Sequence, residues 1–215
     1  AAANDDNGTD SGSAYIYEYD PSSDTWLEVK LTASDGTIWD GFGRAVAASG
    51  QRVVVGANGN GLVGSSGNAY IYERDPSTDT WLETEIFASD GADSDNFGTS
   101  VAIDGSTVVI GAKYEDNANG VNAGSAYVYK YDPASDSWLE TKLIAGDGVA
   151  NDQYGISVAV SGTTVVVGAP QKTHSAMNNA GNAYIYEYDP VGDTWIETKL
   201  TASNQSCTAN FGFSG

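Results

Sequence analysis

A fifteen-residue segment occurs four times in this chain of 215 residues, and its repetition restricts the fold more than any other feature. The tryptophans of the four copies are spaced by 55, 57 and 57 residues, and the aromatic-Gly pairs keep the same spacings. Two independent anchors with one period indicate a tandem structural repeat of about fifty residues, which is typical of propellers and solenoids. The anchors are Trp26, Trp81, Trp138 and Trp195, with Phe42, Phe97, Tyr154 and Phe211 opening the aromatic-Gly pairs.

Each repeat contains four segments with the composition of β-strands. Between positions 42 and 88 they read RAVAAS, QRVVVGA, NAYIYERD and WLETEIFA. The first two are separated by Ser49-Gly50, a tight hairpin signal, and the last two by the turn DPSTDT, in which Pro76 presets the backbone. Helical periodicity is absent, so the sequence predicts an all-β chain.

The pattern of apolar residues predicts the order of the strands. The valine-rich segments are apolar on both faces, as expected of a strand between two neighbours, whereas WLETEI alternates and suits an outermost, half-exposed strand. Four-stranded antiparallel sheets that repeat in tandem pack radially as the blades of a β-propeller. The repeats span 1–41 (partial), 42–96, 97–153, 154–210 and 211–215, which gives three complete blades and partial blades at both ends.

The charge of the chain restricts its partners. With 29 acidic and 9 basic residues the net charge is -20, which excludes nucleic acid as a partner because phosphates need basic groups. No apolar run is long enough to insert into a membrane. Cys207 is the only cysteine, so it is a free thiol or forms an external disulfide with a partner. Asn7 and Asn204 lie in glycosylation sequons, which fit a secreted protein.

Three stretches resemble the FG-GAP repeat, which builds the β-propeller of integrin α chains. They read FGRAVAASGQRVVVGA, FGTSVAIDGSTVVIGA and YGISVAVSGTTVVVGAP, and the resemblance extends over essentially the whole chain. It implies a propeller at the cell surface or in the extracellular space that contacts other proteins. Integrin-type repeats also carry a calcium loop between the two motifs. Here that interval holds only a short turn such as Ser49-Gly50, so those calcium sites are not carried over.

The partial blades leave three interpretations open. The chain is a part of a longer propeller, with seven blades usual in the family, or a four-bladed ring with one defective blade. Alternatively, another molecule donates the strands that complete the partial blade. An unpaired strand edge exposes backbone N–H and C=O groups that invite strand addition, so we expect protein partners or self-assembly through the open blade edges.

Strand parity predicts that the long connections share one side of the disc. The connections between blades are acidic and repeat the pattern Asp-Gly followed by a second Asp, which suits Ca²⁺ because this ion takes six to eight oxygen ligands. The alternative is that each aspartate caps its own turn. The candidate calcium ligands are Asp35, Asp40, Asp90, Asp93, Asp95, Asp147 and Asp152. The fourth copy has Asn204, Cys207 and Ala209 at these positions and is expected to be empty.

Trp39 is the best candidate for a ligand contact on this side. It occurs once, and its copies are Ser94, Asn151 and Thr208. Catalytic constellations are scarce, because the single histidine, His174, has no second histidine or cysteine beside it. We therefore expect no enzyme.

The sequence leaves three functions open. The first is an extracellular or cell-surface module for adhesion or structural assembly. The second is a calcium-assisted domain that binds a glycan or protein ligand. The third is the non-catalytic part of a larger hydrolase.

Overall fold

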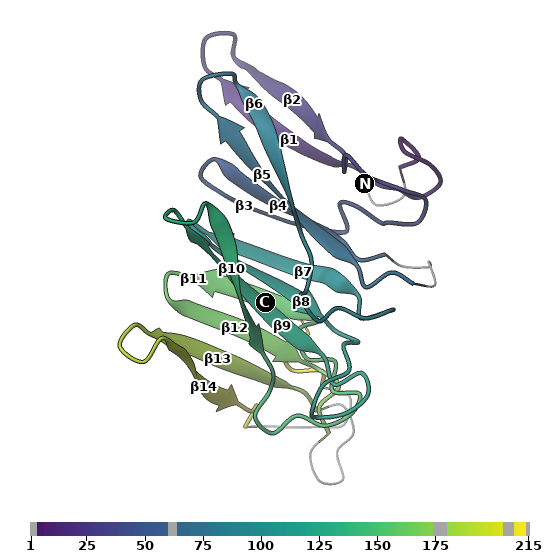
Figure 1. Cartoon of the computed structure of the whole chain (residues 1–215), viewed down its shortest axis with the longest axis vertical. Coiled ribbons are helices and arrows are strands. Elements are labelled where there is room, and N and C mark those ends of the chain that lie inside the picture. The colour runs from purple at the N-terminus through teal and green to yellow at the C-terminus, as the bar shows by residue number, and fades with distance from the viewer. Residues whose placement is uncertain (1–3, 60–63, 174–179, 204–208, 214–215) are drawn as a thin grey trace.

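The computed structural model describes residues 4–59, 64–173, 180–203 and 209–213 (Figure 1). Within these ranges the chain forms fourteen strands and no helix, so no described segment has the helical length and apolarity that crossing a bilayer requires. The predicted strand segments of the second repeat are confirmed to within two residues at each end.

The strands form one two-stranded and three four-stranded antiparallel sheets, which we call blades 1 to 4. Blade 1 contains β1 (Ala14–Asp20) and β2 (Thr25–Leu31). Blade 2 contains β3 (Ala45–Ser49), β4 (Arg52–Ala57), β5 (Asn68–Asp75) and β6 (Thr80–Ile86). Blade 3 contains β7 (Phe97–Asp104), β8 (Thr107–Ala112), β9 (Ser125–Asp132) and β10 (Ser137–Leu143). Blade 4 contains β11 (Ser157–Ser161), β12 (Thr164–Ala169), β13 (Asn182–Asp189) and β14 (Thr194–Leu200).

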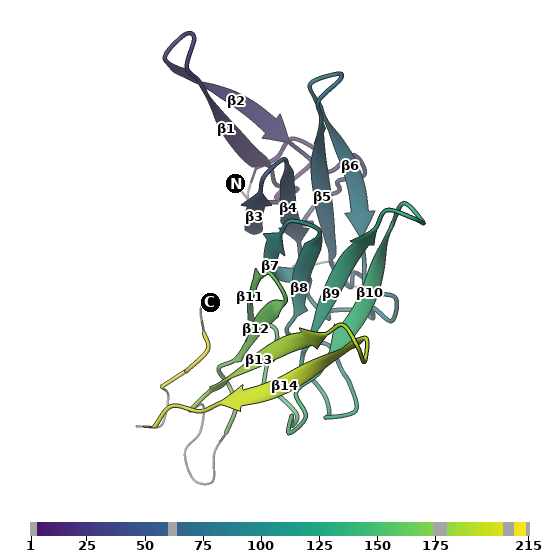
Figure 2. The same cartoon turned by 90° about the vertical axis from the view of Figure 1, so that its left-hand side faces the viewer.

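The blades are arranged as an open arc. The inner strands β3, β7 and β11 lie side by side, and the outer strands diverge from them (Figure 2). The all-β propeller with three complete four-stranded blades is confirmed. Within the described ranges the blades at both ends are partial, since blade 1 has two strands, β1 and β2, and Phe211 lies against Gly181 as Phe42 lies against Gly12. The residue boundaries of the repeats remain a prediction.

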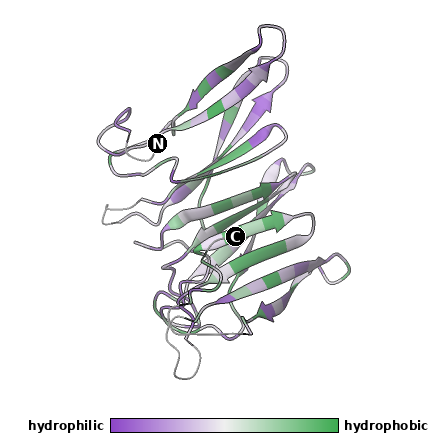
Figure 3. Cartoon of the chain, turned by 180° about the vertical axis from the view of Figure 1, so that it is seen from behind, coloured by the Kyte–Doolittle hydropathy of each residue, from purple (hydrophilic) through white to green (hydrophobic). Residues whose placement is uncertain are grey.

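The hydrophobic core lies between neighbouring blades rather than inside any one of them. Between blades 2 and 3, Val54 and Ile71 pack against Val108 and Tyr127, all of them buried. Equivalent clusters join blades 1 and 2 and blades 3 and 4, and hydrophobic bands cross the strands while the connections are mostly hydrophilic (Figure 3). Each sheet therefore depends on its neighbour to remove its apolar face from water.

The outermost strands are half exposed, as their alternation predicts, but the leucine side is the more exposed one. Leu82 and Leu139 are both more than half exposed, because the blades diverge at the rim. The opposite side carries Glu83 and Glu140, whose carboxylates accept hydrogen bonds from Tyr72 and Tyr129.

The paired glycine motifs mark places where the backbones of two blades touch. A Cβ atom added to Gly111 would lie 1.8 Å from the carbonyl oxygen of Gly155 in the next blade, and one added to Gly168 would lie 1.9 Å from that of Gly212. No side chain fits there, because a real Cβ never comes so close to an oxygen. The aromatic-Gly pair at the start of each FG-GAP-like stretch and the Gly-Ala pair at its end, such as Gly111-Ala112, are thus the two sides of one contact.

We predict that Gly111→Ala destabilises the protein by about 3 kcal/mol or more, because both colliding groups are backbone and neither can rotate away. The free energy of unfolding, measured in urea, checks this. The matched control is Gly105→Asn in the hairpin turn of the same blade. That position also has a positive φ, of 57°, but an added Cβ meets nothing within 4 Å, and asparagine tolerates this conformation. An equal loss in both variants would contradict the contact.

Candidate functional site

The long connections gather on one side of the arc, as strand parity predicts (Figure 1). We call this side the loop face. It is formed by the connections from β2 to β3, β4 to β5, β6 to β7, β8 to β9 and β10 to β11 and by the described ends of the connection from β12 to β13, and it holds all the candidate calcium ligands. Among the connections that the structure describes, those on the opposite side are the short hairpin turns.

The first aspartate of each blade-to-blade connection accepts a hydrogen bond from a buried tyrosine of the next blade. The hydroxyl–carboxylate distances are 2.8 Å for Tyr70 and Asp35, 2.8 Å for Tyr127 and Asp90, and 2.7 Å for Tyr184 and Asp147. Burial first, and the neighbouring carboxylate second, raise the pKa of the Tyr127 hydroxyl far above its ordinary value. These tyrosines stay protonated and act as donors that tie consecutive blades together.

The second aspartate holds its own loop. Asp95 accepts a hydrogen bond from the backbone N–H of Ala92 at 2.7 Å, and Asp152 accepts one from that of Val149 at 2.8 Å. Asp40 does the same with Thr37 at 2.5 Å. This is the turn-capping geometry in which an Asx side chain satisfies a backbone donor.

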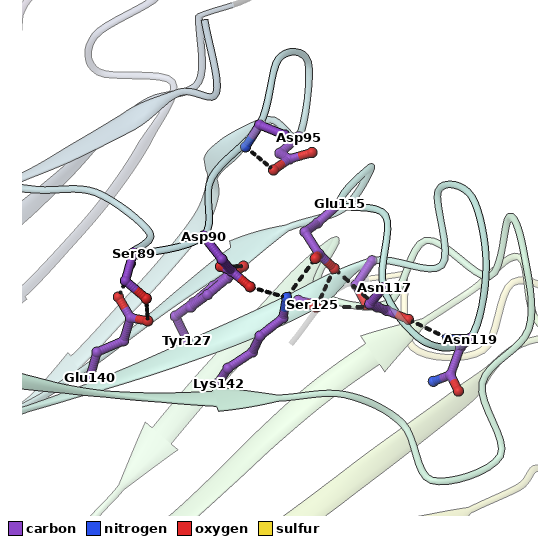
Figure 4. Close-up of polar contacts among 12 residues, drawn as sticks. Ser89, Asp90, Asp95, Glu115, Asn117, Asn119, Ser125, Tyr127, Glu140 and Lys142 are labelled. Carbon is purple, nitrogen blue, oxygen red and sulfur yellow. Dashed lines mark hydrogen bonds and ion pairs between the residues drawn. The ribbon is translucent and has the colours of Figure 1, made fainter.

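A lysine completes the cluster between blades 2 and 3 (Figure 4). The ammonium of Lys142 lies between Asp90, at 2.6 Å, and Glu115, at 2.5 Å. Burial opposes ionisation of Asp90, but the hydrogen bonds from Lys142 and Tyr127 outweigh it and hold the pKa of Asp90 below its ordinary value. Glu115 is buried and also accepts hydrogen bonds from Ser125, at 2.6 Å, and Asn117, at 3.0 Å.

The same position carries a lysine between blades 3 and 4 but a glutamate between blades 1 and 2. Lys199 contacts Asp147 at 2.7 Å, in the way that Lys142 contacts Asp90. The equivalent of these lysines in blade 2 is Glu85, whose carboxylate accepts a hydrogen bond from Asn68 at 2.8 Å. Burial, followed by the negative charge of Asp35, raises the pKa of Glu85.

Blade 4 also contains a buried ion pair that blade 3 lacks. The ammonium of Lys172 lies 2.8 Å from Asp152, and both side chains are buried. The equivalents of these residues in blade 3 are Glu115 and Asp95, two carboxylates. Burial and the negative charges of Glu115 and Asp116 raise the pKa of Asp95, although its backbone hydrogen bond acts in the opposite direction. The loop face therefore differs from blade to blade in charge while its backbone repeats.

The described residues contain no group of three or more acidic, histidine or cysteine side chains placed to hold one metal ion. Six of the seven predicted ligands bond a tyrosine, a lysine or a loop amide, and Asp93 is exposed. Calcium at these connections remains a prediction.

Trp39 lies on the loop face with 41% of its surface exposed. Its φ is 67°, and its copies Ser94 and Asn151 have φ values of 72° and 66°. In each of the three copies the backbone N–H of this position donates to the preceding connection, to Thr9, Ser65 and Val121. A left-handed backbone conformation is rare for a residue with a bulky side chain. The sequence contains no signal that predicts this conformation at Trp39.

The predicted modification sites are only partly described. Asn7 is exposed, and its side-chain amide donates to the carbonyl of Ala33 at 3.1 Å, so it ties two connections together. Its glycosylation remains a prediction. Asn204, Cys207 and the single histidine, His174, lie outside the described residues.

Comparison with known proteins adds one strong match and one weak one. The sequence pattern of the FG-GAP repeat matches residues 26–72, 81–129 and 138–186, more than half of the chain. No curated protein sequence matches. Among solved structures, Sqt1 of Saccharomyces cerevisiae is similar with a TM-score of 0.45 and 11% sequence identity. The similar part covers 77% of this chain and 36% of Sqt1, and a likeness at this level carries no argument about function.

We predict that Glu85→Lys stabilises the protein by about 0.5–1 kcal/mol at neutral pH, because it places an ammonium beside Asp35 as in the two later copies. The folded-state pKa of Glu85 is raised, so its charged form weakens the fold as pH rises through that pKa. The gain from the lysine should therefore be largest at neutral pH and shrink as the solution is acidified to about pH 4.

The melting temperature as a function of pH measures this effect, and the reverse exchange is the control. Lys142→Glu should lower the melting temperature, because it removes the ammonium between Asp90 and Glu115. A Glu85→Lys variant that melts at or below the wild-type temperature at neutral pH would show that the three positions are not equivalent.

Proposed function

The chain belongs to the FG-GAP repeat family, and from this we propose that it is a non-catalytic extracellular or cell-surface module. Its role is adhesion or structural assembly through protein–protein contacts. The family match supports a β-propeller that serves protein interaction, and the arrangement of exposed aromatic residues supports assembly in particular.

The observation that carries the proposal is a row of exposed tyrosines on β1. Tyr15, Tyr17 and Tyr19 share one face of this strand, and 38%, 56% and 50% of their surfaces are exposed. The equivalents of Tyr15 and Tyr17 in blades 2, 3 and 4 are all buried. They are Tyr70 and Tyr72, Tyr127 and Tyr129, and Tyr184 and Tyr186.

The buried tyrosines of blades 2 to 4 show which groups this face of the strand contacts when a neighbouring blade is present. Tyr129 donates to the carbonyl of Phe87 in the connection from the preceding blade, at 3.0 Å, and packs edge-on against the ring of Phe97. On β1 the hydroxyl of Tyr17 bonds only within its own blade, to Glu28 at 2.6 Å, among the hydrogen bonds of the described residues. Tyrosine is enriched at the centres of protein interfaces because it buries a large ring and keeps a polar tip.

We predict that the chain self-associates through the face of Tyr15, Tyr17 and Tyr19. Sedimentation velocity from the micromolar to the submillimolar range should show a mass that rises with concentration. Replacing all three tyrosines with serine should leave a monomer, because the apolar area that drives association is removed. The control variant has serine in place of Leu82, Leu139 and Val191, which are also exposed, and it should associate like the wild type. A wild-type chain that stays monomeric throughout would contradict self-assembly.

A second candidate, ligand binding on the loop face with the help of calcium, is favoured by Trp39. Its left-handed backbone costs about 1–2 kcal/mol relative to an ordinary conformation, while the copy Asn151 suits that conformation. A bulky, exposed aromatic residue in a strained backbone conformation is consistent with a side chain that contacts a glycan or a protein surface.

We predict that Trp39→Asn raises the free energy of unfolding by about 1 kcal/mol and abolishes glycan binding. Thermal unfolding and a glycan array, each in calcium and in excess chelator, measure the two effects. The control, Ser94→Asn, changes the equivalent position without removing an aromatic ring and should bind as the wild type does. Binding that survives in Trp39→Asn, or that is absent from the wild type in calcium, would overturn this candidate.

A further inference from the structure

A groove of about 580 Å³ lies between blades 3 and 4 at the rim of the arc. Its blade 3 wall contains Pro133, Leu139 and Thr141, and its blade 4 wall contains Tyr188 and Trp195. Ligand sites commonly have volumes of roughly 300–1,000 Å³ and are lined by aromatic and apolar groups. Leu139 and Thr141 are exposed, so the groove opens to solvent. Both walls belong to complete four-stranded blades, so the groove does not depend on the partial blades.

The blade 4 wall of this groove is an aromatic pair. Tyr188 and Trp195 lie opposite each other on β13 and β14, with ring centroids 5.2 Å apart and ring planes at 52°. The hydroxyl of Tyr188 donates to Asp193 at 2.5 Å, which fixes its ring. Both rings are partly exposed, so they offer an aromatic surface of defined orientation to a ligand in the groove.

The same aromatic pair occurs between blades 2 and 3, but there an arginine of the protein lies against it. The guanidinium of Arg52 lies 5.3 Å from the ring centroid of Tyr131 and 5.7 Å from that of Trp138. An ion pair with Glu73 at 2.9 Å holds Arg52 in this place. The equivalent of Arg52 in blade 3 is Thr107, whose side chain is too short to reach the next blade.

The interface between blades 1 and 2 has an arginine in place of the tyrosine. Arg74 is the equivalent of Tyr188, and its guanidinium joins the two walls by ion pairs with Glu18, at 2.6 Å, and Asp79. The equivalent of Glu18 in blade 3 is Lys130, whose ammonium lies 3.6 Å from the ring centroid of Tyr188. Among the three interfaces of the described structure, the one between blades 3 and 4 therefore has an aromatic pair with no arginine across it.

The indole of Trp195 also has an unused hydrogen-bond donor. Its N–H donates to no group of the residues that the structure describes, although the ring lines the groove. Tryptophan is enriched at protein interfaces because its large ring is apolar while its N–H can bond an acceptor of the partner. The groove therefore offers an apolar surface and one donor aimed at an acceptor-rich ligand.

We propose that the groove between blades 3 and 4 binds a proline-rich segment of another protein in the polyproline II conformation. The proposal deepens the protein-contact role above and rests on it, since it names the chemistry of a partner. Such segments dock in aromatic-lined grooves, because their helix is already formed and loses little entropy on binding. Their prolines pack on Tyr188 and Trp195. Since proline has a carbonyl but no N–H, the segment supplies the acceptor that the Trp195 indole needs.

The charge around the groove favours basic residues beside the prolines. Three carboxylates and two ammonium groups line it, from Asp132, Glu140, Asp193, Lys130 and Lys142. The ammonium of Lys142 is already paired with Asp90 and Glu115, and the chain as a whole has a net charge of -20. A segment with arginine or lysine next to its prolines is therefore attracted, whereas an acidic segment is repelled.

The test uses the whole 215-residue chain and a fluorescent peptide of six prolines with two arginines at each end. Fluorescence anisotropy should show saturable binding with one peptide per chain. Thr141→Arg should weaken binding at least tenfold, because its long cationic side chain occupies the groove and repels the peptide. The matched control Thr84→Arg changes the equivalent exposed threonine of blade 2 and should bind like the wild type.

A second variant copies the first interface at the third. Lys130→Glu together with Tyr188→Arg supplies the ion pair that Glu18 and Arg74 form between blades 1 and 2. This double variant should stay folded, as measured by its melting temperature, and should bind the peptide at least tenfold more weakly.

Two further readouts identify the contact itself. A peptide with alanine in place of all six prolines should bind at least tenfold more weakly, because it lacks the preformed helix. Nuclear magnetic resonance resolves the indole N–H signals of the five tryptophans, and that of Trp195 should shift most on binding.

Four results would overturn the proposal. They are no saturable binding, equal binding by Thr141→Arg and Thr84→Arg, equal binding of the two peptides, and a larger shift at another tryptophan than at Trp195. The proposed function is tested separately by sedimentation. A chain that binds no peptide but still associates through the tyrosines of β1 would keep the assembly role and lose the groove.

Discussion

The direct contact of backbone with backbone between blades is the constraint on which the rest of this structure depends. The carbonyl of the glycine in each aromatic-Gly pair lies against the glycine of the preceding Gly-Ala pair, with no side chain between them. This approach sets the spacing of the inner strands, and the outer strands then diverge from it. Because the spacing is fixed at the inner edge, the tyrosines of the third strand reach the connection of the preceding blade. The acidic connections are held in a repeated geometry as a result.

Side-chain hydrogen bonds and ion pairs also join the blades. The residues that form them differ from one interface to the next, while the backbone is the same. The tyrosine–aspartate bond occurs at all three interfaces, but the residue beside it is glutamate at the first and lysine at the other two. Buried charges in blade 4 form a pair, whereas their equivalents in blade 3 have the same sign. The charge of the connections thus differs from blade to blade without altering the fold that positions them.

Much of the fold could be predicted from the sequence. The spacing of the repeats, the alternation of apolar and polar residues in the strands, and the turn residues are local signals, and each of them occurs in every repeat. The order of strands in a blade followed from the all-apolar VVVG segments and the alternating WLETEI segments. The side-chain contacts between neighbouring blades could not be predicted in the same way. The hydrogen bond of Asp90 to Tyr127 joins residues 37 apart in the chain, and no periodicity indicates it. The exposure of Leu82 depends on how far the blades diverge, and the left-handed backbone of Trp39 accompanies a hydrogen bond from its N–H to the distant carbonyl of Thr9. Each of these three features arises only when the blades pack against one another.

The variation from lysine to glutamate at one position has a consequence for how the arc comes apart. In a tandem array, stability is a sum of terms for single units and for the contacts between nearest neighbours. The first interface lacks the ammonium that lies beside Asp90 and Asp147 at the other two. Under force or mild denaturant, blade 1 should therefore detach while blades 2 to 4 stay folded. Partial unfolding would then begin at this interface, while the contacts among blades 2 to 4 persist.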